Sequence, residues 1–289
     1  VDCMRGSSIR MLQHHRTPPI LLTFEDRSQP RVASPRAASA ASSLPLWVSN
    51  AVNVAAHSYS GWFSKPAALH KWLRHKAHLK NELVVFVDGA DVVFGGCTDF
   101  VARFARIEES LPNNAAGAVL FSAELGCDFH VPREVGCAGV PPPPAEADTA
   151  QKPLLRWADC ARAGPAPCAW PPSLRFLNAG GIAGRASALR RMLDVVMRYP
   201  HARVQNEQTG VADDGLAYTR FWLEAAPGAA ALDYNASLFL SLWRLHTDAL
   251  LQRADGALAP AWSPDVPACF IHGNGGAFSN SSEWRRVLT

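Results

Sequence analysis

Two aspartates stand at the end of a strongly apolar run. The run covers residues 83–87, and Asp88 and Asp91 follow it in a DxxD spacing. Two carboxylates at this spacing on a turn can converge on one divalent cation that prefers oxygen ligands. The alternative is a solvated turn with a helix-capping aspartate, and the bare spacing favours that alternative. The place at the end of a buried strand makes the two interpretations about equally strong.

A histidine far along the chain has a similar setting. The apolar residues 269–271 precede His272, and Gly273, Asn274 and Gly275 follow it. Imidazole suits Mn²⁺, Fe²⁺ or Zn²⁺ better than Mg²⁺ or Ca²⁺. The alternative is an ordinary hydrogen-bonded loop histidine. The two glycines would let the backbone approach a phosphate closely.

Two further polar clusters are candidates for a sugar or phosphate site. Gly180, Gly181 and a third glycine follow Asn178, which on glycine count alone is a weak signal. Asp213 and Asp214 form an acidic pair ahead of a helical pattern. The pair suits the N-terminus of a helix, and the alternative is a carboxylate that orients sugar hydroxyls or stabilises a cationic sugar-like transition state.

The elements that must position these groups alternate between strand and helix. Apolar residues at near-helical spacing after Pro66 predict a helix, and Thr98 and Ser187 are candidate caps of two later ones. The runs 83–87 and 118–123 are typical of strands buried on both faces, and 19–24 is a further short strand. This order predicts an α/β fold with a parallel sheet.

Ligands of such sheets bind beyond the carboxyl ends of the strands. Glu124 follows the apolar run 118–123, as Asp88 follows its own. We therefore expect Asp88, Asp91 and Glu124 at one edge of the sheet.

Composition excludes several classes of protein. The chain has 289 residues, of which 48% are hydrophobic and 18% charged, so a sizeable core is expected. A net charge of +3 is too small to indicate a nucleic-acid binder. No apolar run approaches the roughly 18 residues of a membrane helix. The phosphate-binding loop, the dinucleotide fingerprint and the GxSxG elbow are absent from the sequence.

Seven cysteines and a proline-rich stretch at about 132–173 remain to be explained. The stretch is expected to be an irregular surface insertion. No CxxC pair is present, so a structural zinc site is not expected, and free thiols and disulfides are both open. Disulfides would stabilise a poorly cored loop, and four cysteines flank or lie in this one: Cys127, Cys137, Cys160 and Cys168.

The ordered set of segments resembles the glycosyltransferase domain of the procollagen lysyl hydroxylase and collagen glucosyl- and galactosyltransferase family. The resemblance covers roughly residues 60–280. Six segments carry it in order: LVVFVDGADVVFGG (83–96), VLFSAE (119–124), RFLNAGGIAG (175–184), ADDGLAYTRFWL (212–223), LDYNASLF (232–239) and IHGNG (271–275).

This resemblance implies an α/β GT-A fold, a Rossmann-like and mostly parallel sheet flanked by helices. It implies a Mn²⁺ ion held by Asp88, Asp91 and His272. It also implies a UDP-glucose or UDP-galactose donor and a protein or glycan hydroxyl acceptor, such as hydroxylysine of a collagen-like protein or its galactosylated form. Asp213 and Asp214 match the family's acidic stretch near the donor sugar and would be catalytic. Residues implied to contact the sugar or phosphates are Lys65, Asn178, Gly180, Gly181, Gly273, Asn274 and Gly275.

The sequence departs from the family at several positions. Ala90 replaces an aromatic residue of the DxxD segment, Asp128 a tryptophan, and Gly215 a glutamine. Residues 1–45 are expected to form a poorly defined segment without a clear first strand and helix, and 46–289 the GT-A domain. The altered pocket leaves two alternatives: a non-catalytic nucleotide-sugar or glycan-binding module, or a transferase for a polysaccharide or hydroxyproline-rich acceptor.

The resemblance also implies that the protein is located in the lumen of the endoplasmic reticulum or Golgi, or is secreted. Sequons at Asn235 and Asn280 give this weak support. The first 31 residues lack the apolar core of a signal peptide.

Overall fold

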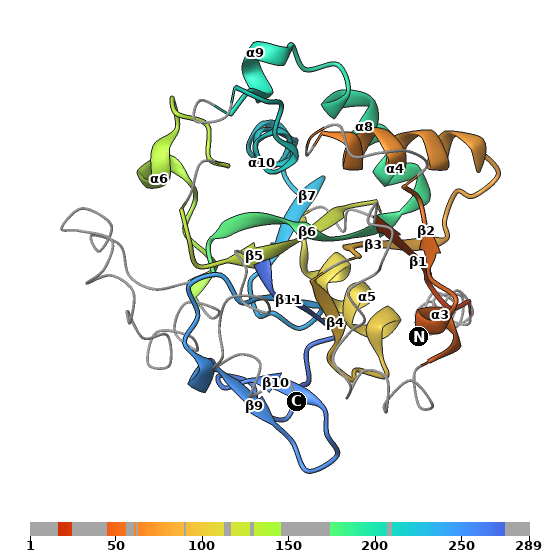
Figure 1. Ribbon diagram of the computed structural model, residues 1–289, viewed down its shortest axis with the longest axis vertical. Helices are drawn as coiled ribbons and strands as arrows, with labels where there is room; N and C mark the ends of the chain where they lie inside the picture. Colours follow the sequence, from red (N-terminus) through yellow and green to blue (C-terminus); the bar gives the residue numbers. More distant parts are fainter. Residues whose placement is uncertain are drawn as a thin grey trace, which may run out of the picture.

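One mixed sheet organises the part of the chain that the structure describes (Figure 1). The computed structural model describes residues 17–24, 45–55, 61, 63–89, 91–112, 117–127, 130–145, 174–206 and 210–274. Within those residues, nine strands form the sheet in the order β2-β1-β3-β6-β5-β8-β11-β4, with β7 paired to β5. The strands are β1 (Ile20–Phe24), β2 (Val52–Asn53), β3 (Leu83–Asp88), β4 (Val92–Phe94), β5 (Val119–Glu124), β6 (Phe176–Arg185), β7 (Ala230–Asp233), β8 (Phe239–Ser241) and β11 (Phe270–His272).

The direction of the strands places the ends of β3, β5 and β11 at one edge. Strand β6 lies between β3 and β5 and is antiparallel to both, so those two strands run the same way. Strand β5 is parallel to β8, and β8 is parallel to β11. Strands β6 and β4 are the antiparallel members of a mostly parallel sheet. The edge predicted from the sequence is therefore confirmed.

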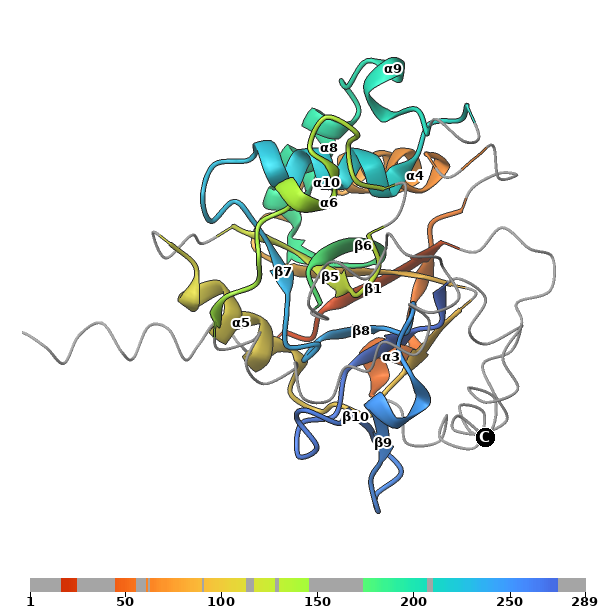
Figure 2. The ribbon, with the colours of Figure 1, turned by 90° about the vertical axis from the view of Figure 1, so that its left-hand side faces the viewer.

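Helices cover both faces of the sheet (Figure 2). One face carries α4 (Ser64–His75), α8 (Ala186–Val196) and α10 (Asp214–Glu224), and α5 (Phe100–Ser110) lies on the other. The short helices are α3 (Leu46–Ser49), α6 (Gly136–Gly139), α9 (His201–Val204) and the 3₁₀ turn Thr247–Ala249, and β9 (Leu250–Gln252) pairs with β10 (Leu258–Pro260) as a separate hairpin. None of the described helices has the length and apolar character needed to cross a membrane.

Strand β3 shows why the central strands are apolar throughout. Val84 and Phe86 pack into the cluster formed with α4 and α8, whereas Val85 and Val87 pack into the cluster that contains Phe104 of α5. Because successive side chains point to opposite faces, a strand covered on both faces needs an unbroken apolar run. The α/β GT-A-like fold class expected from the sequence is confirmed by this layering.

Two helix starts differ from the sequence prediction. Helix α5 has Asp99 at its N-cap position instead of Thr98, and the Asp99 carboxylate accepts from Arg103 Nε at 2.6 Å. Helix α8 begins at Ala186, directly after β6, so Ser187 lies inside it. The amides of residues 186 and 187 donate to carbonyls of the turn before β3, at residues 82 and 80. Backbone carbonyls thus take the place of the expected side-chain cap.

The N-terminal strand predicted at 19–24 is confirmed as β1. It pairs in parallel with β3, from Ile20 opposite Val84 to Phe24 opposite Asp88. The division of the chain at residue 45 stays a prediction, although β1 belongs to the main sheet. Of the proline-rich insertion, 132–145 include the short helix α6, and 146–173 lie outside the described residues.

Among the described residues, two disulfides link segments that flank strands of the sheet. Cys127 bonds Cys137 at the start of the proline-rich insertion, as the clustering of cysteines suggested. Cys160 and Cys168 lie outside the described residues. Cys97 bonds Cys269 across a sequence separation of 172, a pairing that the sequence analysis did not foresee. Cys97 follows β4 and Cys269 precedes β11, so a covalent bond joins two strands that also pair by hydrogen bonds.

Replacing both Cys97 and Cys269 by alanine is expected to lower the free energy of unfolding by about 2–5 kcal/mol, because a long loop of the unfolded chain is no longer closed. Urea denaturation under non-reducing conditions measures the change. The matched control replaces Cys127 and Cys137, whose separation is only 10 residues. A larger loss in the control than in the Cys97 and Cys269 variant would contradict the prediction.

Candidate metal site

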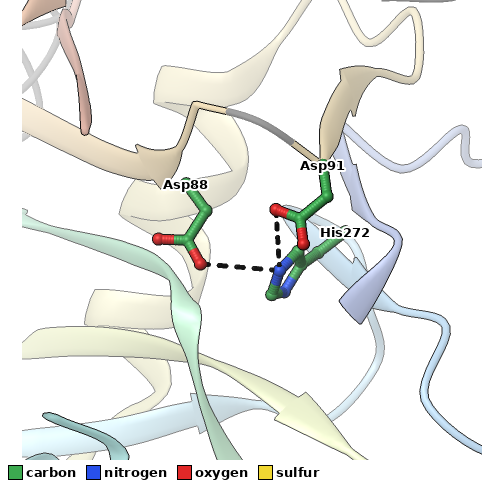
Figure 3. A group of neighbouring side chains, drawn as sticks. All are labelled: Asp88, Asp91 and His272. Atoms are coloured by element: carbon green, nitrogen blue, oxygen red, sulfur yellow. Dashed lines mark ion pairs between the residues drawn. The ribbon is translucent and has the colours of Figure 1, made fainter. Parts of the chain in front are cut away.

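Three ligand-type side chains converge at the sheet edge (Figure 3). Nε2 of His272 lies 3.6 Å from an Asp88 oxygen and 3.4 Å from an Asp91 oxygen. One ligand atom from each residue lies within 4.8 Å of the other two. His272 and Asp88 are largely buried, whereas the side chain of Asp91 is 38% exposed. The site is therefore buried at Asp88 and His272 and open to solvent at Asp91.

Strand pairing brings His272 to the two aspartates. Asp88 ends β3, and Asp91 precedes β4. Strand β4 pairs antiparallel with β11, which places Val92 opposite His272. The Gly273 amide then donates to the carbonyl of Asp91 at 2.7 Å. The backbone thus fixes the distance between the DxxD turn and the end of β11.

An asparagine on β6 fixes the orientation of the His272 ring. Asn178 Oδ1 accepts from the amide of Gly180 at 2.9 Å and lies 2.9 Å from His272 Nδ1. A backbone amide can only donate, so this Asn178 atom is the oxygen. His272 Nδ1 therefore carries the proton, and Nε2 faces the carboxylates, as in the common arrangement of metal-binding histidines.

A buried glutamate holds two asparagines beside the triad. Glu124 Oε2 accepts from Asn178 Nδ2 at 2.9 Å and from Asn274 Nδ2 at 2.8 Å. Asn274 Oδ1 in turn accepts from Ser241 Oγ at 2.8 Å and from the Trp243 amide at 3.0 Å. The structure thus places both asparagines in a network behind His272, whereas the resemblance implied contacts to sugar and phosphate. Those implied contacts stay predictions.

The glycines of β6 make room for neighbouring side chains. A Cβ atom on Gly180 would lie 2.1 Å from Cε1 of His272, and one on Gly181 would lie 2.6 Å from Cδ1 of Phe239. The requirement for glycine therefore has a packing cause at both positions. Their predicted contact with a donor substrate is not tested by this geometry.

A buried lysine offsets the negative charge. Lys65 on α4 donates to Asp88 Oδ2 at 2.8 Å, and its ammonium lies 3.7 Å from Asp214 Oδ2. Burial opposes the charge of the ammonium, but Asp88 and Asp214 outweigh it and raise the pKa of Lys65 above its ordinary value. Burial raises the pKa of Asp214 to about 6, although Lys65 acts in the opposite direction.

The two aspartates of the acidic pair have different surroundings. Asp213 is the N-cap of α10 and accepts from the Leu216 amide at 2.8 Å, which is the capping interpretation of the sequence. Its carboxylate also bonds His130 Nδ1 at 2.8 Å and Asn206 Nδ2 at 3.3 Å. Asp214 Oδ2 is buried without a hydrogen-bond partner and faces Lys65. Of the two aspartates, Asp214 is the one linked to the triad, because Lys65 lies between Asp214 and Asp88.

His130 is a residue that the sequence analysis missed. Burial opposes its charged form, but the hydrogen bond that the ring donates to Asp213, together with the nearby carboxylates, raises the pKa of His130. A Cβ atom on Gly215 would lie 2.5 Å from His130 Nδ1. The glycine that departs from the family pattern thus leaves space for this ring. Two histidines, His130 and His201, lie between the DxxD segment and the acidic pair, and no motif in the sequence distinguishes His130 from His201.

The remaining predicted residues lie at the same edge or outside the described residues. Gly273 and Asn274 follow β11 directly. Gly275, together with Ala90, Asp128 and Asn280, lies outside the described residues. Lys65, which the resemblance placed near phosphate, donates a hydrogen bond to Asp88 in this structure.

The donor set fits a divalent cation. It combines two carboxylates with one imidazole whose Nε2 points between them, a set that suits Mn²⁺, Fe²⁺ or Zn²⁺. Asp88 Oδ2 is the oxygen that faces Nε2 of His272, whereas Asp88 Oδ1, on the other side of the carboxylate, is buried without a hydrogen-bond partner. The carboxylates outweigh burial and raise the pKa of His272, so cation binding would compete with a proton on Nε2.

Two solved structures with low sequence identity are similar to the chain, whereas family models and curated proteins give no match. No family model matches the chain. No curated protein matches it either. One solved structure is a glycosyltransferase involved in the glycosylation of the major capsid of PBCV-1, with 10% identity, a TM-score of 0.43, and coverage of 94% of this chain and 100% of that one. Another is A197 from STIV, with 12% identity, a TM-score of 0.36, and coverage of 84% and 94%. Both scores are too low to carry an argument about activity.

Replacing Gly180 by alanine is expected to weaken Mn²⁺ binding by about tenfold or more, because the added methyl group would displace the His272 ring. Titration calorimetry with MnCl₂ measures the affinity. Gly184→Ala on the same strand is the matched control, since its Cβ would come no closer than 3.2 Å to the Leu189 side chain. Unchanged affinity in Gly180→Ala would contradict the assignment of His272 as a ligand.

Asp214 is expected to make stability depend on pH in the metal-free protein. Its folded pKa of about 6 lies above the ordinary 3.8, so its contribution is present at low pH and is lost as pH rises through about 6. The stability of Asp214→Asn relative to the unaltered protein should increase by on the order of 2–3 kcal/mol between about pH 4 and pH 7. Urea denaturation with a chelator present measures this difference, and a difference that shrinks with pH would contradict the prediction.

Proposed function

We propose that this chain is a metal-dependent glycosyltransferase that moves glucose or galactose from a UDP-sugar to a hydroxyl acceptor. The observation that carries the proposal is the convergence of Asp88, Asp91 and His272 at the carboxyl edge of the sheet. Two of these residues lie on the DxxD turn, and the third comes from a distant strand. The resemblance of the six sequence segments to the collagen glycosyltransferase family supplies the reaction and the donor.

The metal, which we propose to be Mn²⁺, would neutralise the diphosphate and act as a Lewis acid on the departing UDP. Asp88, Asp91 and His272 would hold it, and Nδ1–H of the ring stays engaged with Asn178. The exposed side of Asp91 gives the donor access to the ion. A net charge of only +3 fits a site in which the ion, more than a basic surface, binds the diphosphate.

Lys65 and Asp214 form an ion pair beside the proposed metal ligands. The Lys65 ammonium lies 2.8 Å from Asp88 Oδ2 and would complement a phosphate. Asp214, whose buried Oδ2 has no hydrogen-bond partner, would accept a hydrogen bond from a hydroxyl of the donor sugar or acceptor and stabilise positive charge at the reacting carbon. Asp213, the N-cap residue of α10 next to Asp214, would act on the same donor sugar or acceptor.

The acceptor and the compartment are proposed from the resemblance alone. A hydroxylysine of a collagen-like protein, or its galactosylated form, is the acceptor proposed first, and a polysaccharide or hydroxyproline-rich protein is the alternative. The two disulfides fit an oxidising compartment such as the lumen of the endoplasmic reticulum or Golgi, or the outside of the cell.

Asp88→Asn and His272→Ala are expected to abolish Mn²⁺-dependent release of UDP from UDP-glucose and UDP-galactose, because each removes a ligand of the metal. A coupled assay for UDP, run with and without Mn²⁺, measures the release. Asp255→Asn is the matched control, since this carboxylate lies on the exposed β9–β10 turn away from the triad. Full activity in either ligand variant would disprove the metal assignment.

Calorimetry combined with the UDP assay separates a transferase from a binding module. Calorimetry with UDP and Mn²⁺ reports binding, and the UDP assay reports turnover. Binding without turnover in the presence of an acceptor panel would favour a non-catalytic nucleotide-sugar or glycan-binding module. The departures at Ala90 and Gly215 motivate this comparison.

A further inference from the structure

The hydrogen bonds around Asn178 have only one consistent direction. The amide of Gly180 donates to Oδ1, so the other terminal atom of Asn178 is Nδ2, a donor. That donor needs an acceptor, and it lies 2.9 Å from Glu124 Oε2. A flipped Asn178 would set two donors against each other at Gly180. The orientation of Asn178, and with it the tautomer of His272, follows from these two partners.

Glu124 is the anchor of this network. Its side chain is 2% exposed at the end of β5, and the same oxygen receives the amide groups of Asn178 and Asn274. Ser241 Oγ also lies 3.4 Å from that oxygen, although its proton is donated to Asn274 Oδ1 at 2.8 Å. A buried carboxylate is costly unless donors surround it, and hydrogen bonds to a charged acceptor are stronger than neutral ones. The network therefore holds both asparagines firmly.

We propose that Glu124 is a positioning residue: acting through Asn178, it holds Nε2 of His272 as the nitrogen that ligates a divalent cation. Glu124 lies behind the ring and does not contact the cation in this arrangement. The inference rests on the proposed metal site, and it adds the residues that preorganise that site. It also gives Asn178 a role that requires no contact with the donor substrate.

Calorimetric titration with MnCl₂ alone, without nucleotide, tests the role of Glu124. Glu124→Ala and Asn178→Ala are each expected to weaken Mn²⁺ binding by about 10- to 100-fold, the usual cost of losing a partner behind a metal ligand. Glu124→Gln keeps an oxygen that can accept from both asparagines, so its loss should stay below about threefold. Far-ultraviolet circular dichroism and the thermal midpoint confirm that each variant is folded.

A matched control distinguishes positioning from general destabilisation. Asp233 is also a buried strand-end carboxylate, but its oxygens accept only from residues 237, 238 and 239 of its own loop. Asp233→Asn should lower stability and leave Mn²⁺ affinity within about threefold. Nitrogen NMR of the Cd²⁺-loaded protein adds a readout of the ring itself: Nε2 bound and Nδ1 protonated in the unaltered protein and Glu124→Gln, with this pattern lost in Asn178→Ala.

The outcomes separate this inference from the proposed function. An unaltered protein that does not bind Mn²⁺ overturns both. Metal binding with no difference between Glu124→Ala and the unaltered protein overturns the positioning role alone. An equal loss in Glu124→Ala and Glu124→Gln would assign the effect to the charge of Glu124, and it would also overturn positioning. A loss of Mn²⁺ affinity in Asp233→Asn as large as in Glu124→Ala would show that general destabilisation causes the loss, and it would overturn the positioning role.

Discussion

The accumulation of negative charge at one sheet edge is the constraint on which the rest of the structure depends. Asp88, Asp91 and Asp214 lie close together, and two of them are largely buried. Carboxylates in such a place repel one another and lose hydration, so they require a counter-charge. The Lys65 ammonium supplies one positive charge between Asp88 and Asp214. A divalent cation at the triad would supply the rest, which links the electrostatics of folding to the chemistry of the site.

Different parts of the fold hold the members of this charge cluster. The ammonium comes from α4 on one face of the sheet, Asp88 from a strand buried on both faces, and His272 from the edge pairing of β11 with β4. His272 has both covalent and packing support: the Cys97–Cys269 disulfide before β11, and the Gly180 backbone against the ring. Several independent elements thus define the site, and not a single loop.

The α/β class and the place of Asp88, Asp91 and Glu124 at one edge of the sheet could be predicted from the residues for a clear physical reason, whereas the resemblance to a known family added His272 to the two aspartates. Apolar strands buried on both faces end abruptly at polar residues, and strands that run the same way bring those ends together. The roles of Asn178 and Gly180 could not be predicted in the same way. They depend on β6 lying antiparallel between β3 and β5, and a run such as RFLNAGGIAG carries no sign of its direction or its neighbours. Asp213 shows an intermediate case, because helix capping was one of two open interpretations and the structure displays that bond.

The pairing of β11 with β4 has a consequence for how the protein reaches its folded state. The two strands lie far apart in the sequence, at residues 92–94 and 270–272, yet Ile271 pairs with Val93 and His272 with Val92. Contacts between such distant segments form slowly, because the entropy of closing the intervening loop is lost before the contact contributes. Helices α4 and α5 and strand β3 can form earlier from nearer segments. A nascent chain therefore has the DxxD turn long before it has the histidine, and the complete ligand set arises only in the last stage of folding.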